Sequence, residues 1–338
     1  MNKKIFEEEI NQIDREIELV KRLDSVNNKL HKFNWIFLHP YSQGMDIEIL
    51  RKLSLEENPE EKILAFYARK FLDLRTTIHF VEGFYKTRPF LKDYISSIRE
   101  SVILCLQKDF KGAITVLIPV IEGTLRKYLI SRKGEQKKHT IDIKELLKAI
   151  PILTDEYVER SKNGLKSRHK HSIEANNYLD FNQEKELLKR NRMYFELWMK
   201  QLKNYLENNL YLNTKHNEVQ DSFNRHLIFH ALEDNIEYSF ANYLRLFNSL
   251  NFLSWAIGLT NDGCSVLSVA NEDEVKSLWV DYLNILIASE ALTETKSNIH
   301  EKDILSFKPY LDKAVINAIK RPEAIIKKGV KLHDFLKK

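Results

Sequence analysis

Residues that interrupt regular structure are scarce in this chain. Glycine (9) and proline (7) together make up 16 of 338 residues, under 5%, whereas soluble proteins usually carry roughly 12%. Glycine allows left-handed backbone at sharp turns, and proline cannot continue a helix or a central strand. Strand-rich folds and glycine-rich nucleotide-binding folds need many such residues. The scarcity therefore predicts an all-α fold built from long helices.

Cysteine content, apolar runs and missing motifs narrow the class of protein. Cys105 and Cys264 are too few for a disulfide framework or a zinc cluster, and they fit a reducing cytoplasm. Residues 1–10 are polar and acidic, so no secretory signal is expected. The longest apolar run, Ala113–Ile121, is shorter than the roughly 20 residues of a membrane span. We therefore expect a cytoplasmic protein with no membrane contact. Because phosphate-binding loops, a nucleophile elbow and an H-E-x-x-H pair are missing, nucleotide hydrolases, dehydrogenases, esterases and zinc proteases are disfavoured.

Apolar periodicity divides the chain into three predicted helical regions, at residues 1–90, 91–262 and 263–338. The first region opens with an amphipathic helix over 1–30. Two further helices are expected before residue 90, separated near Asn58-Pro59, because proline favours the first turn of a helix.

The central region combines apolar helices with a polar insertion. Helices are expected over 91–107, 113–131 and 183–207. Residues 132–180 are polar and basic, which predicts a long loop with one short helix near 141–150.

The last core helix of the central region is predicted from a cap and a long apolar pattern. Asp221 or Ser222 is the candidate N-cap, because a side-chain oxygen there can accept hydrogen bonds from a first helical turn. Apolar residues recur at helical spacing over 227–253, which predicts one helix from this cap to about residue 260.

Arg225 and His230, near the start of this helix, are the candidate catalytic pair. An imidazole transfers protons near neutral pH, and a guanidinium binds phosphate oxygens. Together they suit metal-independent RNA cleavage, in which a 2′-oxygen attacks the adjacent phosphorus. His226, or a second pair from a twofold-related chain, would protonate the leaving oxygen. By spacing alone, a surface arginine and a core-edge histidine are the simpler interpretation.

Two basic stretches suit phosphate binding. Residues 160–171 hold five Lys/Arg and no carboxylate, and Lys166, Arg168 and Lys170 are the candidate RNA contacts. Residues 313–338 carry eight Lys/Arg against two carboxylates, a balance of +6, so a net charge of +5 leaves the rest near −1. Solvated surface is the alternative interpretation of each stretch.

The stretch Asn224-Arg225-His226-Leu227-Ile228-Phe229-His230 resembles the signature helix of the HEPN superfamily. In that motif an arginine and a histidine are separated by four to six residues. The upstream run ending Ile121-Glu122-Gly123-Thr124-Leu125 resembles the helix that pairs with the signature helix in bacterial members. The resemblance covers about residues 91–262. Ala231 stands where close relatives often carry glycine, so the helix is expected to continue smoothly past His230.

The resemblance implies a HEPN-like helical bundle that commonly dimerises, with two Arg–His motifs meeting in one cleft. It implies an endoribonuclease of an abortive-infection, toxin–antitoxin or other antiviral defence system. By position, Arg225 and His230 would be catalytic, Asn224 and His226 flanking polar residues, and Glu122 a carboxylate that orients Arg225. The implied partners are RNA, a second copy of the chain, and an antitoxin or regulatory protein. No cofactor or metal is implied.

The sequence leaves other interpretations open. The chain could be a non-catalytic RNA-binding or protein-interaction module, or its terminal helices could hold the cleft shut until a trigger arrives. A shorter pair, Arg75 and His79, lies in an apolar helix and is interpreted as structural. Aromatic residues on predicted helices are expected in the core rather than as base-stacking platforms: Tyr194, Phe195, Trp198 and Trp255.

Overall fold

The computed structural model describes residues 3–30, 33, 35, 44–133, 143–173, 181–211, 238–261, 264 and 270–297. Every regular element in these residues is helical, which confirms the all-α prediction. The α-helices are α1 (Lys3–Leu30), α2 (Gly44–Leu53), α3 (Pro59–Phe71), α4 (Leu74–Ile78), α5 (Ile95–Leu106), α6 (Phe110–Lys133), α7 (Ile143–Leu147), α8 (Ala149–Ile173), α9 (Phe181–Tyr205), α11 (Phe240–Thr260) and α12 (Glu272–Ser297). Short π-helical and 3-10 segments are η2 (His79–Phe84), η3 (Tyr85–Thr87), η4 (Lys92–Tyr94) and η5 (Leu206–Leu210).

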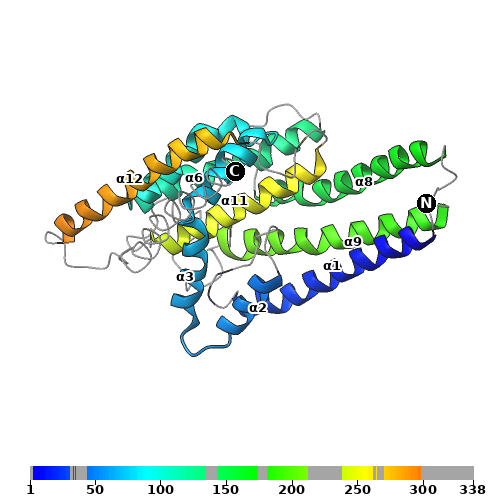
Figure 1. The fold of residues 1–338 in the computed structure, drawn as a ribbon, viewed down its shortest axis with the longest axis horizontal. Helices are drawn as coiled ribbons and strands as arrows, with labels where there is room; N and C mark the ends of the chain where they lie inside the picture. Colours follow the sequence, from blue (N-terminus) through cyan, green and yellow to red (C-terminus); the bar gives the residue numbers. More distant parts are fainter. Residues whose placement is uncertain are drawn as a thin grey trace, which may run out of the picture.

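Helix α6 lies at the centre of the molecule, packed against α5 and α11 (Figure 1). A tight turn joins α5 to α6, with Lys108 in left-handed backbone at φ 63°. The Asp109 carboxylate then accepts a hydrogen bond from the Gly112 N–H at 2.9 Å. This bond satisfies a donor that the first turn of a helix leaves free. The α5–α6 hairpin therefore forms from local signals and presents its apolar faces to α11.

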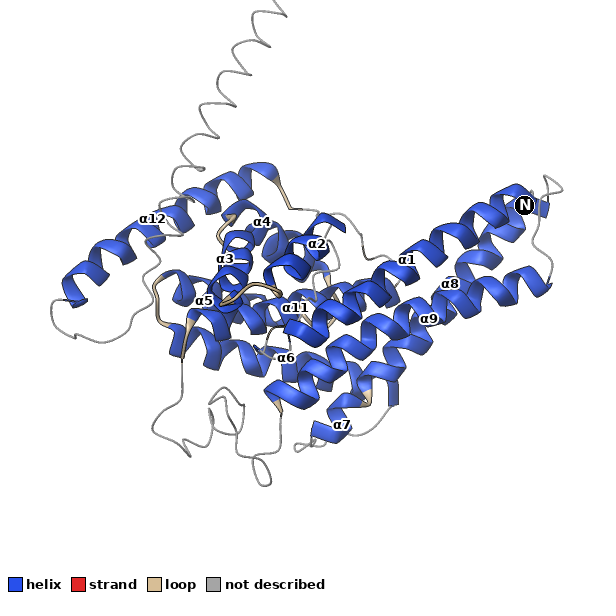
Figure 2. Cartoon of the chain, turned by 90° about the horizontal axis from the view of Figure 1, so that it is seen from below, coloured by secondary structure: helices blue, strands red, loops and turns tan. Residues whose placement is uncertain are grey.

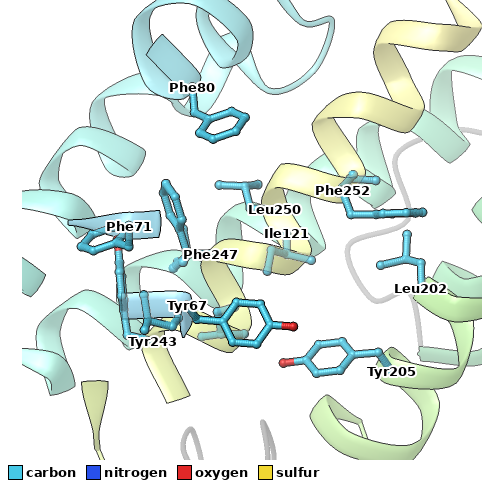
Figure 3. Close-up of a cluster of buried hydrophobic side chains, with 14 of the residues drawn as sticks. Tyr67, Phe71, Phe80, Ile121, Leu202, Tyr205, Tyr243, Phe247, Leu250 and Phe252 are labelled. Atoms are coloured by element: carbon cyan, nitrogen blue, oxygen red, sulfur yellow. The ribbon is translucent and has the colours of Figure 1, made fainter. Parts of the chain in front are cut away.

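An aromatic cluster joins α3 to α11. The Phe71 ring meets Phe240, Tyr243 and Phe247 edge-on, with ring centroids 6.0, 5.4 and 5.1 Å apart. Figure 3 shows Phe71, Tyr243 and Phe247 of this cluster, which belong to the same core as Ile121 of α6. Edge-to-face pairs add about 0.5–1.5 kcal/mol each to the free energy gained by burial. The N-terminal helices are thus packed onto the central region across the predicted boundary at residue 90.

Helices α1, α8 and α9 run side by side and extend away from the rest of the molecule (Figures 1 and 2). We call these three helices the arm. Leu165 and Leu187 form a small buried cluster within it, against Phe6 and Ile10 of α1. Asn27 of α1 also donates a buried hydrogen bond to Gln201, which ties α1 to α9.

The arm corrects one prediction, because residues 132–180 are not a long loop. Residues 149–173 form α8, a helix of 25 residues that packs along α9. The buried apolar residues of α8 gather at its start, with Leu165 further along, so the polar composition of the rest gave a misleading signal.

The predicted core aromatics lie inside as expected. Phe195 and Trp198 are buried, whereas Tyr194 and Trp255 are half-buried and pack against the same core. Phe195 stacks on Tyr157 with ring centroids 4.4 Å apart. These four rings join α9 to α8 and α11 rather than forming an exposed stacking surface.

Candidate functional site

The candidate catalytic residues fall outside the described part of the chain. Asn224, Arg225, His226 and His230 all lie within 212–237. Their assignment to RNA cleavage stays a prediction from the sequence.

The chain re-enters the described part beside the start of α6. Lys111 lies over the Tyr238 ring at 5.6 Å from its centroid, and Phe240 packs against Phe110 at 5.9 Å. Ser239 between them is extended, and its side chain accepts a hydrogen bond from the backbone N–H three residues on, at 3.3 Å. Ser239 is therefore the N-cap of α11.

This cap corrects the prediction of one helix from Asp221 or Ser222 to residue 260. Residues 238–239 are not helical, and α11 begins at Phe240. Any helix through His230 is therefore interrupted before α11. Apolar spacing missed the interruption because the residues on either side happen to keep helical spacing.

Glu122, the carboxylate expected near Arg225, lies at the middle of α6. Its side chain is half-buried, so the carboxylate lies at the edge of the apolar face of α6. Gly123 beside it faces Tyr94, and an added Cβ would lie 2.2 Å from the tyrosine hydroxyl oxygen. The glycine therefore lets α6 approach η4 closely.

Lys166, Arg168 and Lys170 lie in the carboxyl-terminal part of α8. Their side chains are outside the description. The helix replaces the mobile loop that the sequence predicted for them. Their backbones therefore have the regular spacing of a helix, which a loop would not impose.

Arg75 and His79 both face α12. Four residues apart in a helical stretch, they share one face. The Arg75 Nη2 lies 2.7 Å from one oxygen of Glu272, and the His79 Nε2 lies 3.7 Å from the other. The Arg75 side chain is 49% exposed and that of His79 is 24% exposed, so the pair is a surface feature. The spacing of four residues in the sequence already indicates that Arg75 and His79 lie on the same face of a helix.

A buried carboxylate lies next to this pair. Glu82 in η2 has a side chain only 1% exposed, and it accepts hydrogen bonds from Nε and Nη2 of Arg99. Lys86 lies 3.7 Å from the same carboxylate and 3.4 Å from Glu274 of α12. The hydrogen bond to Glu82 raises the pKa of Arg99. Burial, and then the charge of Glu82, raises the pKa of Tyr282 in α12 to about 12.

A second cationic cluster lies at the carboxyl end of α11. Arg160 donates from Nη1 to the carbonyl oxygens of Gly258 and Leu259, at 2.9 and 2.7 Å. Arg88 is 2% exposed and lies over the Phe84 ring, with its guanidinium against Gly258. Its Nε and Nη1 have no hydrogen-bond acceptor among the described residues. The negative end of the α11 dipole offsets part of the cost of burying this charge.

Within the described residues, no group of three or more His, Cys, Asp or Glu side chains is arranged to hold a metal ion. None of the helices in the described ranges combines the length and apolar content that crossing a bilayer requires.

Comparisons with known proteins give no relative. No protein-family model, curated protein or solved structure matches this chain.

Proposed function

We propose that this chain is a metal-independent endoribonuclease of HEPN type, with Arg225 and His230 as its catalytic pair. The observation that carries the proposal is the run Asn224-Arg225-His226-Leu227-Ile228-Phe229-His230, which matches the motif of that superfamily. Supporting it, α6, which contains the upstream resembling segment, packs against α11, the helix that follows the motif along the sequence.

The proposed reaction is an internal transesterification. His230 removes the proton from a 2′-hydroxyl, and the 2′-oxygen attacks the adjacent phosphorus. Arg225 stabilises the negative charge that builds on the phosphorane oxygens. The bond from phosphorus to the 5′-oxygen breaks, and His226 or the His230 of a second copy donates a proton to that oxygen. The products are a 2′,3′-cyclic phosphate and a 5′-hydroxyl.

The proposed setting is the bacterial cytoplasm, in antiviral defence by abortive infection or in a toxin–antitoxin pair. A homodimer would bring two Arg–His pairs to one cleft, and an antitoxin or regulatory protein would restrain the activity. Glu122 would orient Arg225, and Lys166, Arg168 and Lys170 would hold the RNA backbone.

The test is cleavage of an end-labelled RNA in EDTA by the wild type, Arg225→Ala and His230→Ala. We expect the rate to fall about 10²–10⁴-fold for His230→Ala, the usual effect of losing a general base. For Arg225→Ala we expect a fall of about 10²–10³-fold. Arg192→Ala removes an exposed arginine of the arm and is the charge-matched control. Undiminished cleavage by both variants, or loss of wild-type cleavage in EDTA, would reject the proposal.

One observation favours the alternative of a non-catalytic RNA-binding or protein-interaction module. Ser239 caps α11 beyond the motif, so the N-terminus of α11 does not support a phosphate bound at Arg225. Under this alternative the chain binds RNA, and the labelled strand stays intact in every variant.

A further inference from the structure

A row of cations follows the chain from α4 to η3, and the first turn of α12 lies on it. Arg75 and Lys86 supply two cations and His79 an imidazole, and Glu272 and Glu274 of α12 supply the matching carboxylates. We call Arg75, His79 and Lys86 the basic row. No motif assigns a role to these residues.

The Glu272 carboxylate lies between the Arg75 guanidinium and the His79 imidazole, in the way a phosphate group would. One oxygen lies 2.7 Å from the Arg75 guanidinium, and the other lies 3.7 Å from the His79 imidazole. A phosphodiester also presents two non-bridging oxygens, and arginine binds such oxygens well. The carboxylate therefore occupies a position that suits an RNA phosphate.

The first turn of α12 determines which of its acidic side chains contact the basic row. Asn271 accepts a hydrogen bond from the Asp273 N–H at 2.8 Å, which fixes the first turn. Glu272 and Glu274 then meet the cations, whereas Asp273 is 90% exposed and pairs with Lys276 of its own helix. Acidic residues are common in a first turn because the helix dipole favours them, but the dipole alone does not explain why two of the three contact the basic row.

The charges around the basic row are balanced only while α12 is in place. Arg75, Lys86 and Arg99 contribute +3, and Glu82, Glu272 and Glu274 contribute −3. Without the two α12 carboxylates, the same surface carries a charge of +2, with His79 counted as neutral. The buried Glu82 remains with Arg99 and holds η2 in shape.

The contacts with α12 are of a kind that a polyanion can displace. The side chains of Arg75, Glu272, Lys86 and Glu274 are each 40–54% exposed. Ion pairs at such exposure contribute about 0–1 kcal/mol each. An RNA strand with several phosphates can compete for cations that are held this weakly.

We propose that the basic row is an RNA-binding surface for phosphodiester groups, and that Glu272 and Glu274 occupy it as mimics of phosphate oxygens. The choice of RNA as the polyanion rests on the proposed function. The alternative for these contacts is that they only attach α12 to the bundle.

Fluorescence anisotropy with a labelled 2′-O-methyl RNA tests the proposal in full-length protein. This probe lacks the 2′-hydroxyl nucleophile, so the assay measures binding whether or not the chain cleaves RNA. We expect the double variant Glu272→Gln, Glu274→Gln to bind at least 5-fold more tightly than the wild type. We also expect its affinity to fall more steeply with salt, because two more phosphates are bound and more counterions are released.

Two further variants separate a local site from a general effect of charge. Asp155→Asn with Glu196→Gln also removes two exposed carboxylates, here the partners of Arg192 in the arm. This control should change the affinity less than 2-fold. Adding Arg75→Ala and Lys86→Ala to the Glu272→Gln, Glu274→Gln variant should abolish the gain.

An unchanged affinity, or an equal gain in the arm control, would overturn the proposal and leave α12 attachment as the role of these contacts. Competition by heparin as effective as competition by unlabelled RNA would overturn the choice of RNA. Neither result bears on the nuclease proposal, which depends on cleavage of ordinary RNA by Arg225 and His230 variants. Circular dichroism should show the wild-type helix content in every variant, because all the substituted side chains are exposed.

Discussion

At the residue scale, Gly258 shows how one missing side chain lets α11 pack against a buried arginine. A Cβ at this position would lie 2.6 Å from the Arg88 Nε and 2.7 Å from its Cζ. Both groups are held inside the molecule, with Arg88 only 2% exposed. The glycine is required for space rather than for backbone conformation.

We predict that Gly258→Ala lowers the free energy of unfolding by about 1–3 kcal/mol, the usual cost of overpacking. Gly164→Ala is the matched control, because that glycine lies within α8 and an added Cβ would meet nothing within 4 Å. The free energy of unfolding of the control should rise by roughly 0.5–1 kcal/mol, because alanine has a higher helix propensity than glycine. Urea unfolding measures both values, and a neutral Gly258→Ala would contradict the packing described here.

Arg88 also illustrates what a sequence does not reveal about single residues. The apolar pattern predicted buried positions such as Phe195 and Trp198 correctly. A fully buried arginine breaks that pattern, because its burial depends on Phe84 and Gly258, residues brought together only by the fold. The geometry of Arg225 and His230 depends on the fold in the same way.

At the element scale, the start of α11 depends on one serine. Ser239 accepts a hydrogen bond from the Asn242 N–H, at the boundary between extended and helical backbone. We predict that Ser239→Ala lowers the free energy of unfolding by about 1 kcal/mol. Ser239→Asp should retain the wild-type value, because aspartate also accepts this bond and favours the positive end of the helix dipole. Chemical denaturation of the three proteins checks this, and equal stability of the alanine variant would place the cap elsewhere.

Helices could be predicted from the sequence where apolar residues recur at helical spacing along the segment. The expected helices over 1–30 and 183–207 correspond closely to α1 and α9. Prediction failed for α8, because its second half holds few apolar residues and its sequence is mainly polar and basic. It also failed at residues 238–239, because a short break does not disturb a spacing of three or four residues. Ser239 resembles any other serine in the sequence until its neighbours are known.

At the scale of the whole molecule, buried tyrosines set the stability at high pH. Burial is the main cause that raises the pKa of both Tyr157 and Tyr282, in each case to about 12. In the unfolded chain these hydroxyls titrate near 10. Between pH 10 and 12 the folded state therefore holds more protons than the unfolded state, and stability falls as the pH rises.

We predict that the stability contributed by Tyr157 and Tyr282 is complete below pH 10 and is lost between pH 10 and 12. From pH 9 to pH 11 the free energy of unfolding of the wild type should fall by about 1 kcal/mol for each of the two tyrosines. The variant Tyr157→Phe, Tyr282→Phe should lose correspondingly less over the same interval. Urea midpoints at the two pH values measure the difference. Equal losses in the two proteins would show that these hydroxyls do not control the alkaline limit.

The contacts of α1 constrain how the chain matures on the ribosome. Asn27 bonds to Gln201, and Asp14 pairs with Arg190, partners that lie 174 and 176 residues further along the sequence. At a synthesis rate of about 5–20 residues per second, the first helix waits roughly 10–35 s before its partner emerges. During that interval α2 is available to α1, but Phe6 and Ile10 still lack their partners Leu165 and Leu187. Helix α1 is thus translated well before α9 and completes its packing late, so a nascent-chain chaperone would find a binding surface on its apolar face.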